Sequence, residues 1–277
     1  MRLIIVLFLL TVNAWGAGGQ RIISTSPGIT ETLFAMGLGP RVVGVTIYCN
    51  YPEEAKRVTR IGTLLKPDVE AILALHPDLV VVQKQPNHLP EELARLHVTF
   101  VEVQSQNLEA IYAGARIIGK ATNAGAAAEQ MVQSMQADMQ SIAKLAAGRP
   151  RPTVAFIVGH TPGRLEGLIA GAGASYFTDL ITAAGGTNIF ADAIVPYPRI
   201  SLESILSRNP DVILELSGEE QAKQLEVTAV WSSHRTLKAV ATGRVYAIPP
   251  GPALIPGPRA AAAARGLLYM LHPETRP

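Results

Sequence analysis

Six histidines and a single cysteine are the residues of this sequence that most readily bind metals or act in catalysis. No two histidines stand three or four residues apart, and none accompanies Cys49 at the short spacing of a zinc site. The sequence also contains no G-x-S-x-G nucleophile turn and no phosphate-binding Walker loop. We therefore expect neither a metal site made by the protein nor an enzyme. A hydrolase whose Ser and His residues meet only in the folded chain stays open.

Two matched acidic segments indicate binding chemistry instead. Residues 68–80 (DVEAILALHPDLV) and 201–213 (SLESILSRNPDVI) share Glu, Ile, Leu, Pro and Asp at the same positions. Each predicts a short helix capped by its first residue, ended before a proline and followed by a buried strand. Glu70 and Glu203 then lie in the first turns of equivalent helices. There they either stabilise the positive helix end or form a symmetric pair for a basic partner, and the repeat leaves both interpretations open.

Polar and aromatic side chains follow two of the predicted strands. The loop at residues 48–52 comes after a strand predicted at residues 42–46, and such loops often carry ligand contacts in α/β folds. It contains Tyr48 and Cys49, although an ordinary surface turn is the alternative. The Cys49 thiol either meets a metal centre in a ligand or is a small buried group. His160 follows another strand and either lines the same cleft or lies on the surface.

The elements that must position these residues lie on either side of a long helical stretch, residues 107–148. Its apolar residues recur at helical spacing, with a break near Gly119. Its second part, residues 124–147, predicts a rod about 36 Å long at ~1.5 Å per residue. Short strands and helices alternate before and after it. The sequence therefore predicts an α/β fold with two lobes, residues 18–106 and 149–277, each with a small central parallel sheet flanked by helices, joined by this long rigid helix. The expected strands cover residues 21–24, 42–46, 79–82, 98–103, 153–158, 212–214 and 244–248, and the expected flanking helices cover 27–36, 53–57, 91–96, 176–184 and 260–271.

Composition and the first residues limit the class of protein. The 277 residues, 48% of them hydrophobic, are enough for two modest cores. A net charge of +2 without a basic run gives nucleic-acid binding little support. Residues 1–17 predict a cleaved secretory signal, with Arg2 before an apolar run and a small-residue exit. The run is shorter than the ~17–25 residues of a membrane span, which makes a membrane anchor the lesser alternative.

Several motifs together resemble one family. They are Ser26-Pro27-x-x-Thr30-Glu31, Val43-Gly44-Val45, Tyr48-x-x-Tyr51-Pro52, Glu70 to Asp78, Gly185-Gly186-x-Asn188 and Glu203 to Asp211. With the signal and the central helix, they resemble the periplasmic substrate-binding proteins of ABC importers. The resemblance covers residues 21–273. The group that the chain resembles is class III, whose members have a rigid helix between two lobes and bind cobalamin, haem and ferric siderophores. Within that group the chain is most similar to the cobalamin-binding proteins.

The resemblance implies roles for particular residues. In that family the glutamates matching Glu70 and Glu203 dock on arginines of the membrane permease, which favours the docking interpretation. Tyr48 matches a tyrosine of the cobalamin pocket, while Tyr197 and Leu64 stand where close relatives have tryptophans. We therefore expect one group of residues to line the cleft: Tyr48, Cys49, Leu64, His160, Tyr197 and Pro252.

The resemblance also implies a function. We expect a monomeric periplasmic protein, without a cofactor, that captures cobalamin or a related corrinoid and delivers it to an inner-membrane permease. Residues 251–258 lack the acidic and basic pair that contacts corrin side chains in the family, so a different cobamide, a corrinoid precursor or haem stays open. A ferric siderophore is a further alternative. It would need basic residues at the cleft, and the candidate loops carry few beyond Arg164 and Arg199.

Overall fold

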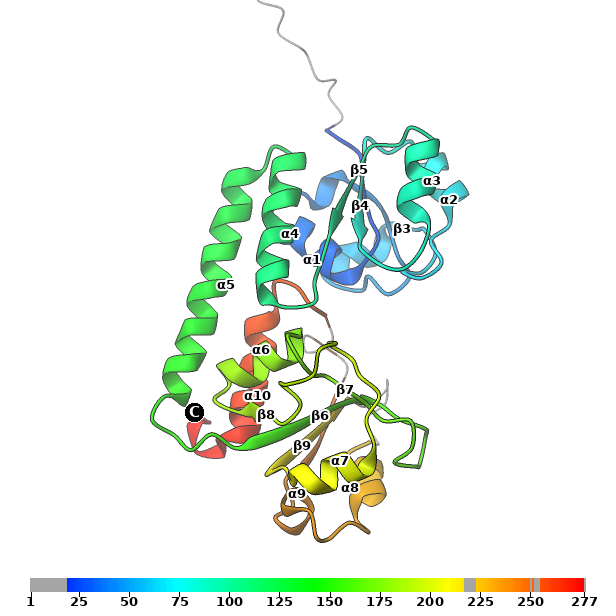
Figure 1. Cartoon of the computed structure of the whole chain (residues 1–277). Coiled ribbons are helices and arrows are strands. Elements are labelled where there is room, and N and C mark those ends of the chain that lie inside the picture. Colours follow the sequence, from blue (N-terminus) through cyan, green and yellow to red (C-terminus); the bar gives the residue numbers. More distant parts are fainter. Residues whose placement is uncertain (1–18, 217–222, 250, 252–254, 277) are drawn as a thin grey trace, which may run out of the picture.

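The computed structural model of the chain describes residues 19–216, 223–249, 251 and 255–276. These residues form two α/β lobes, one above the other in Figure 1, with a long helix along one side. The fold class predicted from the sequence is confirmed. The predicted secretory signal at residues 1–17 and the predicted cleft residue Pro252 lie outside the described residues.

The N-terminal lobe (N lobe) is built on a five-stranded parallel sheet in the order β3-β2-β1-β4-β5. Its strands are β1 (Ile22–Ser24), β2 (Val42–Val45), β3 (Thr59–Arg60), β4 (Leu79–Gln83) and β5 (Phe100–Val103). Helices α1 (Pro27–Ala35), α2 (Val69–Ala74) and α3 (Leu89–Arg95) and the 3₁₀ turns η1 (Gly39–Arg41) and η2 (Glu53–Arg57) connect them. Every residue of the two central strands, β1 and β4, is buried, as expected for a parallel sheet covered on both faces.

The C-terminal lobe (C lobe) has a second sheet in the order β10-β9-β6-β7, with β8 paired to β6. Its strands are β6 (Thr153–Gly159), β7 (Ile169–Ala170), β8 (Thr187–Asn188), β9 (Val212–Leu216) and β10 (Val245–Ile248). Its helices are α6 (Tyr176–Ala183), α7 (Leu202–Arg208), α8 (Lys223–Trp231), α9 (Lys238–Ala241) and α10 (Ala260–Leu271), followed by the 3₁₀ turn η4 (Pro273–Thr275). Only β7 runs antiparallel to its neighbour among the described strands. All seven predicted strands are confirmed to within two residues, and α10 has the predicted bounds.

The linking segment, predicted to break near Gly119, consists of two helices. Helix α4 (Leu108–Ala121) and helix α5 (Gly125–Ala146) pack against each other in opposite directions. The chain reverses at residues 122–124, where Asn123 has a left-handed φ of 56°. Gly119 is therefore not the break but a packing contact, since a Cβ atom there would lie 2.5 Å from the Cβ of Ala128.

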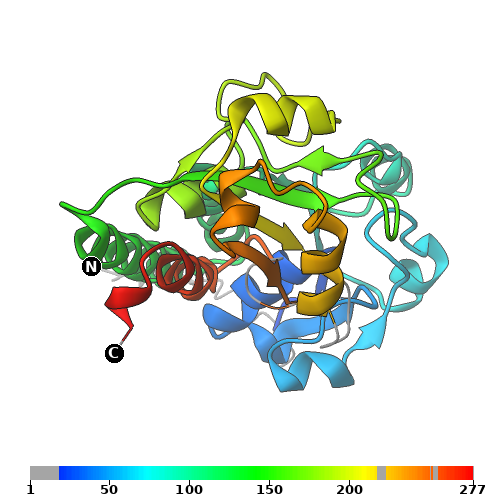
Figure 2. The same ribbon diagram turned by 90° about the horizontal axis from the view of Figure 1, so that it is seen from below.

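Helix α5 carries the chain from the N lobe to the C lobe. Its 22 residues span about 33 Å at ~1.5 Å per residue. It packs on α4 in the N lobe and on α6 and α10 in the C lobe. Figure 2, viewed from below, shows α5 and α10 next to each other at one side of the molecule. The long rigid connection predicted from the sequence is thus this one helix, held along its length by partners from both lobes.

The matched acidic segments are the units α2–β4 and α7–β9. Asp68 caps α2 by accepting a hydrogen bond from the backbone N–H of Ala71 (3.0 Å), and Ser201 caps α7 from that of Ser204 (3.2 Å). The residues before the two prolines, His76 and Asn209, have left-handed φ angles of 44° and 42°. The predicted N-caps are confirmed, and the two helices also end in the same conformation.

The aspartates at the end of each match hold the lobes' first strands in place. The Asp78 carboxylate accepts a hydrogen bond from the backbone N–H of Arg21 (2.6 Å), and the Asp211 carboxylate from that of Thr153 (2.9 Å). The N–H of each aspartate donates in return to the carbonyl of the same partner, at 2.9 and 3.0 Å. The Pro-Asp part of the repeat is thus explained by the fold.

Candidate functional site

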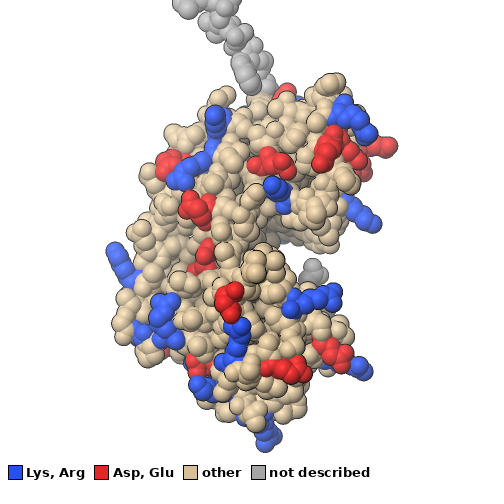
Figure 3. Space-filling view, viewed as in Figure 1, with Lys and Arg blue, Asp and Glu red and all other residues tan. Residues whose placement is uncertain are grey.

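A cleft separates the two lobes on the side away from α5, and Figure 3 shows the surface hollowed there. The lobes meet at its base, where α1 begins next to the C-lobe segment 255–258. A Cβ atom at Gly28 would lie only 2.2 Å from the carbonyl oxygen of Pro256, so this approach requires glycine. The cleft therefore narrows to direct backbone contact at its base.

Hydrogen bonds between α4 and α6 also fix the base of the cleft. The backbone N–H of Tyr176 donates to the carbonyl of Gln106 at 2.5 Å, and that of Leu108 to the Asp179 carboxylate at 2.8 Å. Burial raises the pKa of Asp179, while the hydrogen bond from Leu108 opposes that rise. Asp179 thus supplies a carboxylate from one lobe to the positive N-terminus of a helix in the other.

An aromatic cluster backs the C-lobe side of the cleft base. Phe156 on β6 stacks on Phe177 with ring centroids 4.3 Å apart, and Tyr197 meets Phe177 edge-on at 6.2 Å. Tyr197 keeps 44% of its surface exposed, while burial of its phenol raises its pKa. Packing from behind therefore fixes the Tyr197 ring, which presents a neutral phenol and an apolar face to solvent.

The N-lobe loops expose their own apolar side chains. Tyr48 is 60% exposed, and Leu64 is half-buried beside Leu65, which is 68% exposed. Tyr48 and Tyr197, predicted as ligand contacts, are thus accessible residues on different lobes, and their role as contacts stays a prediction.

Cys49 does not line the cleft, contrary to the prediction. Its side chain is fully buried, with the sulfur 3.1 Å from the Thr46 hydroxyl, and burial raises the pKa of the thiol. Arg60 draws the loop inward, because one of its nitrogens donates to the carbonyls of both Thr46 (2.9 Å) and Cys49 (3.0 Å). The alternative stated from the sequence, a small buried group, is the one the structure supports.

His160 is held within the C lobe by a buried acidic residue. Its Nε2 lies 2.9 Å from a carboxylate oxygen of Glu215, and its Nδ1 donates to the carbonyl of Thr161 at 2.7 Å. The other Glu215 oxygen accepts a hydrogen bond from the indole N–H of Trp231 at 2.8 Å. Because a carbonyl and a carboxylate both accept hydrogen bonds, the imidazolium form satisfies both partners.

The charge state of His160 follows from this environment. Burial acts to lower its pKa, but the hydrogen bonds to Thr161 and Glu215 outweigh burial and raise it. His160 lines a cavity of about 520 Å³ at the end of β6. With both nitrogens engaged, the ring has only its carbon edge to offer a ligand there.

Comparison with known proteins identifies the family. A family model described as periplasmic binding protein matches residues 22–252. The chain belongs to the periplasmic binding protein family. It is 30% identical over 242 residues to the vitamin B12-binding protein of Yersinia pestis (strain Pestoides F), covering 86% of this chain and 82% of the relative. It is 32% identical over 212 residues to the vitamin B12-binding protein of Salmonella paratyphi A, covering 76% of this chain and 77% of that one.

Solved structures share the fold of this periplasmic binding protein over almost its whole length. The vitamin B12 binding protein BtuF of Vibrio cholerae superimposes with a TM-score of 0.77 at 26% identity, covering 94% of this chain and 99% of its own. The heme-binding protein RhuT of Roseiflexus sp. RS-1 gives 0.78 at 25%, covering 94% and 100%. The family resemblance drawn from the motifs is confirmed. The protein is a binding protein and not an enzyme.

The matched glutamates of this periplasmic binding protein are exposed, one on each lobe. Glu70 lies on α2 and Glu203 on α7, helices that Figure 1 places on the N lobe and the C lobe respectively. Glu70 has no side-chain hydrogen bond or ion pair within the described part of the chain. Hydrogen bonds from its own backbone N–H and from Ser201 lower the pKa of Glu203. Both side chains thus face solvent, where a basic partner could reach them.

Several important residues were not predicted from the sequence. Glu215 could have been found, because it is an acidic residue inside an otherwise apolar strand (VILEL). Arg259 carries no comparable signal. It forms an ion pair with Glu31 of α1 through hydrogen bonds of 2.8 and 2.5 Å, although the two stand 228 residues apart in the sequence. That ion pair ties α10 of the C lobe to the N lobe.

The described residues lack two further features. No group of three or more His, Cys, Asp or Glu side chains among them is placed to hold a metal ion. Across the same residues no helix is both long and apolar enough to cross a membrane.

Proposed function

We propose that this protein captures cobalamin or a related corrinoid in its cleft and delivers it, as an exported periplasmic monomer, to the permease of an ABC importer. The observation that carries the proposal is the pair of exposed tyrosines on opposite lobes, Tyr48 and Tyr197. A flat macrocycle of corrin size presents two apolar faces, and an aromatic ring on each side of a narrow cleft suits such a shape. The vitamin B12-binding relatives support the same ligand class.

The packing around Tyr197 favours a largely preformed site. Phe177 and Phe156 hold the Tyr197 ring in place, and α5 and the contacts at the cleft base hold the lobes together. A rigid cleft loses little conformational entropy when a ligand binds. We therefore propose that the lobes move little on binding and that the affinity comes from burying the apolar faces of the macrocycle.

Haem is the second candidate ligand. The heme-binding RhuT resembles this chain about as closely as BtuF does, and a tyrosine phenol can ligate haem iron. A ferric siderophore is less well supported. Arg164 and Arg199 are both exposed, but Arg164 lies 4.0 Å from Glu166, which offsets its charge.

Calorimetric titration of residues 18–277 with cyanocobalamin, a corrinoid precursor, haemin and a ferric siderophore tests the ligand class. Tight one-to-one binding of corrinoids alone supports the proposal. Binding of haemin instead would mean that the transported ligand is haem and not a corrinoid. No binding of any probe refutes the binding role proposed for the cleft. Tyr48→Ala and Tyr197→Ala should each weaken corrinoid binding by about five- to 150-fold, since burying an aromatic side chain against the ligand is worth about 1–3 kcal/mol. Leu145→Ala is the matched control, because Leu145 is 44% exposed and lies in the last turn of α5, the helix on the side of the molecule away from the cleft.

Delivery to the permease is proposed to depend on Glu70 and Glu203. The double substitution Glu70→Ala with Glu203→Ala should abolish uptake in vesicles that carry the permease while leaving ligand affinity unchanged. The control is Glu91→Ala with Glu92→Ala on α3, where Glu91 is exposed and Glu92 half-buried. It removes the same number of negative charges from another part of the N lobe and should leave uptake intact. Weakened ligand affinity in the Glu70 and Glu203 variant would instead place these residues in the cleft or the core.

A further inference from the structure

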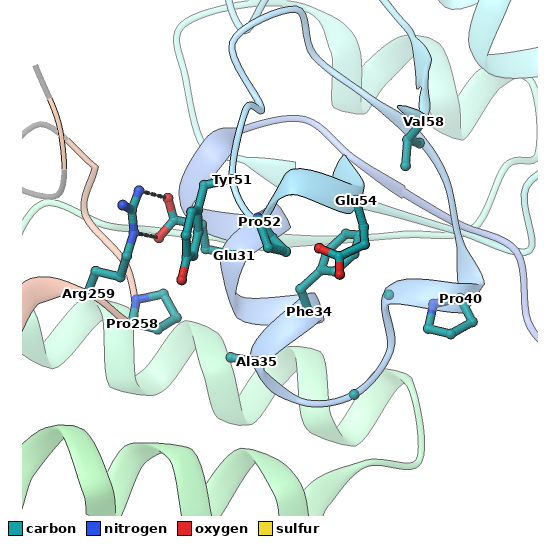
Figure 4. Close-up of a pocket in the computed structure, with 12 residues that line it drawn as sticks. Glu31, Phe34, Ala35, Pro40, Tyr51, Pro52, Glu54, Val58, Pro258 and Arg259 are labelled. Carbon is teal, nitrogen blue, oxygen red and sulfur yellow. Dashed lines mark hydrogen bonds and ion pairs between the residues drawn. The ribbon is translucent and has the colours of Figure 1, made fainter. Parts of the chain in front are cut away.

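A second cavity lies beside the ion pair that joins the lobes. It measures about 710 Å³, within the range of small-molecule sites. Of the residues predicted to line the cleft, none that the structure describes borders this cavity. Figure 4 shows its walls, and we define the hinge pocket by six of the lining residues: Phe34, Tyr51, Pro52, Glu54, Pro258 and Arg259.

The walls of the hinge pocket come from both lobes. Phe34 lies on α1 and Pro52 just before η2, both in the N lobe, while Pro258 and Arg259 directly precede α10 in the C lobe. Apart from its glycines and charged groups, the lining is apolar or aromatic. A molecule bound there would therefore bury its apolar surface against both lobes at once.

One end of the hinge pocket is a fixed aromatic surface. The Arg259 guanidinium lies 3.9 Å from the centre of the Tyr51 ring and is itself held by Glu31, whose side chain is only 3% exposed. In Figure 4 the Tyr51 ring stands between Arg259 and the rest of the pocket. Tyr51 remains 50% exposed, so the structure orders an aromatic ring and leaves much of it free for stacking.

The charge of the hinge pocket is negative. Two carboxylates line the hinge pocket, those of Glu31 and Glu54. Arg259 neutralises Glu31, so the charge of Glu54 is the one that remains. Glu54 is exposed, has no ion pair within the described part of the chain, and lines the hinge pocket together with Phe34 (Figure 4). The neighbouring Glu53 differs on both counts, since it pairs with Lys56 at 2.7 Å and does not line the pocket.

We propose that the hinge pocket is a second binding site, for a small aromatic molecule that carries a positively charged amine. The ring of such a molecule would stack between Tyr51 and the apolar wall, and its ammonium group would face Glu54. Because the site spans both lobes, its occupant would also stabilise their relative position. The proposal does not depend on which ligand occupies the cleft.

Three probes of one shape test the charge preference: 2-phenylethylamine, the neutral 2-phenylethanol and the anionic 3-phenylpropanoate. Binding is followed by saturation-transfer NMR and titration of the full mature chain. We expect the amine to bind more tightly than the alcohol and the carboxylate least tightly. Absence of amine binding, or a carboxylate that binds as well as the amine, overturns the proposal.

Three variants test the location. Glu54→Gln should weaken amine binding about two- to fivefold, the usual effect of one exposed charge pair, and leave the alcohol unchanged. Glu53→Gln is the matched control and should change neither. Val58→Trp, which fills the pocket from a half-buried lining position, should abolish binding of both probes. An unchanged thermal midpoint shows that each variant is folded, and full amine binding by folded Val58→Trp would refute the site.

Discussion

Replacing His160 by leucine should destabilise the C lobe, because the buried carboxylate of Glu215 then loses its ion-pair partner. The side chains of His160 and Glu215 are only 10% and 7% exposed, so neither charge is well solvated in the folded protein. Removing one partner of a buried ion pair typically costs about 3–5 kcal/mol, mainly because the other charge stays buried without compensation. Trp231 still donates to Glu215 in the variant, which places the expected loss in the free energy of unfolding near the lower figure, about 3 kcal/mol.

The pH dependence of this loss distinguishes an ionic cause from a lost packing contact. The pKa of His160 is raised in the folded protein, so its stabilising effect is complete below the unfolded pKa of about 6.5 and is lost as pH rises through the folded pKa. The difference in the free energy of unfolding between the two proteins should therefore be largest below about pH 6.5 and should shrink as pH rises through the folded pKa of His160.

Urea unfolding followed by tryptophan fluorescence measures this difference directly. Trp231 is the only tryptophan after the predicted signal, and it is fully buried and bonded to Glu215. His160→Leu combined with Glu215→Gln should recover most of the loss, because the amide keeps an oxygen for Trp231 without the charge. His88→Leu, at an exposed position in the N lobe, is the control. A loss that stays constant from pH 5 to pH 9, or that the double variant does not recover, refutes the ionic explanation.

Three further predictions concern the loop and the base of the cleft. The Cys49 thiol should not react with a thiol reagent until the protein unfolds, with or without a corrinoid or haem; rapid reaction in the native state contradicts its burial. Arg259→Met should lower the free energy of unfolding by about 3–5 kcal/mol, because it leaves the buried carboxylate of Glu31 without its ion-pair partner. Adding Glu31→Gln should restore part of that loss, as measured by thermal unfolding. Gly28→Ala should lower the melting temperature because of the contact with Pro256, although alanine in a free helix gains about 0.5–1 kcal/mol over glycine; a higher melting temperature would contradict this.

Much of the fold could be predicted from the sequence because its signals are local. Buried parallel strands are short apolar runs, and the helix starts carry caps that the structure confirms, such as Ser26 on α1 and Asp68 on α2. Helices α8 and α9 escaped prediction, because α8 has little amphipathic pattern and α9 is a single turn. The direction of α5 relative to α4 also escaped, because helical periodicity does not show where a chain reverses.

The candidate site was less predictable because its contacts join distant parts of the sequence. Exposed Tyr48 lies next to fully buried Cys49, and only the turn held by Arg60 separates their environments. His160 reads from sequence as a cleft or surface residue, yet its partner Glu215 stands 55 positions away on β9. Pairings of this kind depend on strand order and register, which local patterns of apolar residues do not specify.

The acidic repeat separates residues that the fold needs from residues that it does not. Asp78 and Asp211 anchor first strands, so the fold accounts for their recurrence. Glu70 and Glu203 could serve merely as negative charges at helix starts, a role that aspartate fills equally well. Glu70→Asp with Glu203→Asp therefore keeps the helix-end charge while shortening the reach of each carboxylate by one methylene. If the glutamates act as a docking pair, this variant should unfold like the parent, bind ligand normally and deliver it poorly. Normal delivery by the aspartate pair, together with loss of stability in the alanine pair, would leave the helix-end role as sufficient explanation.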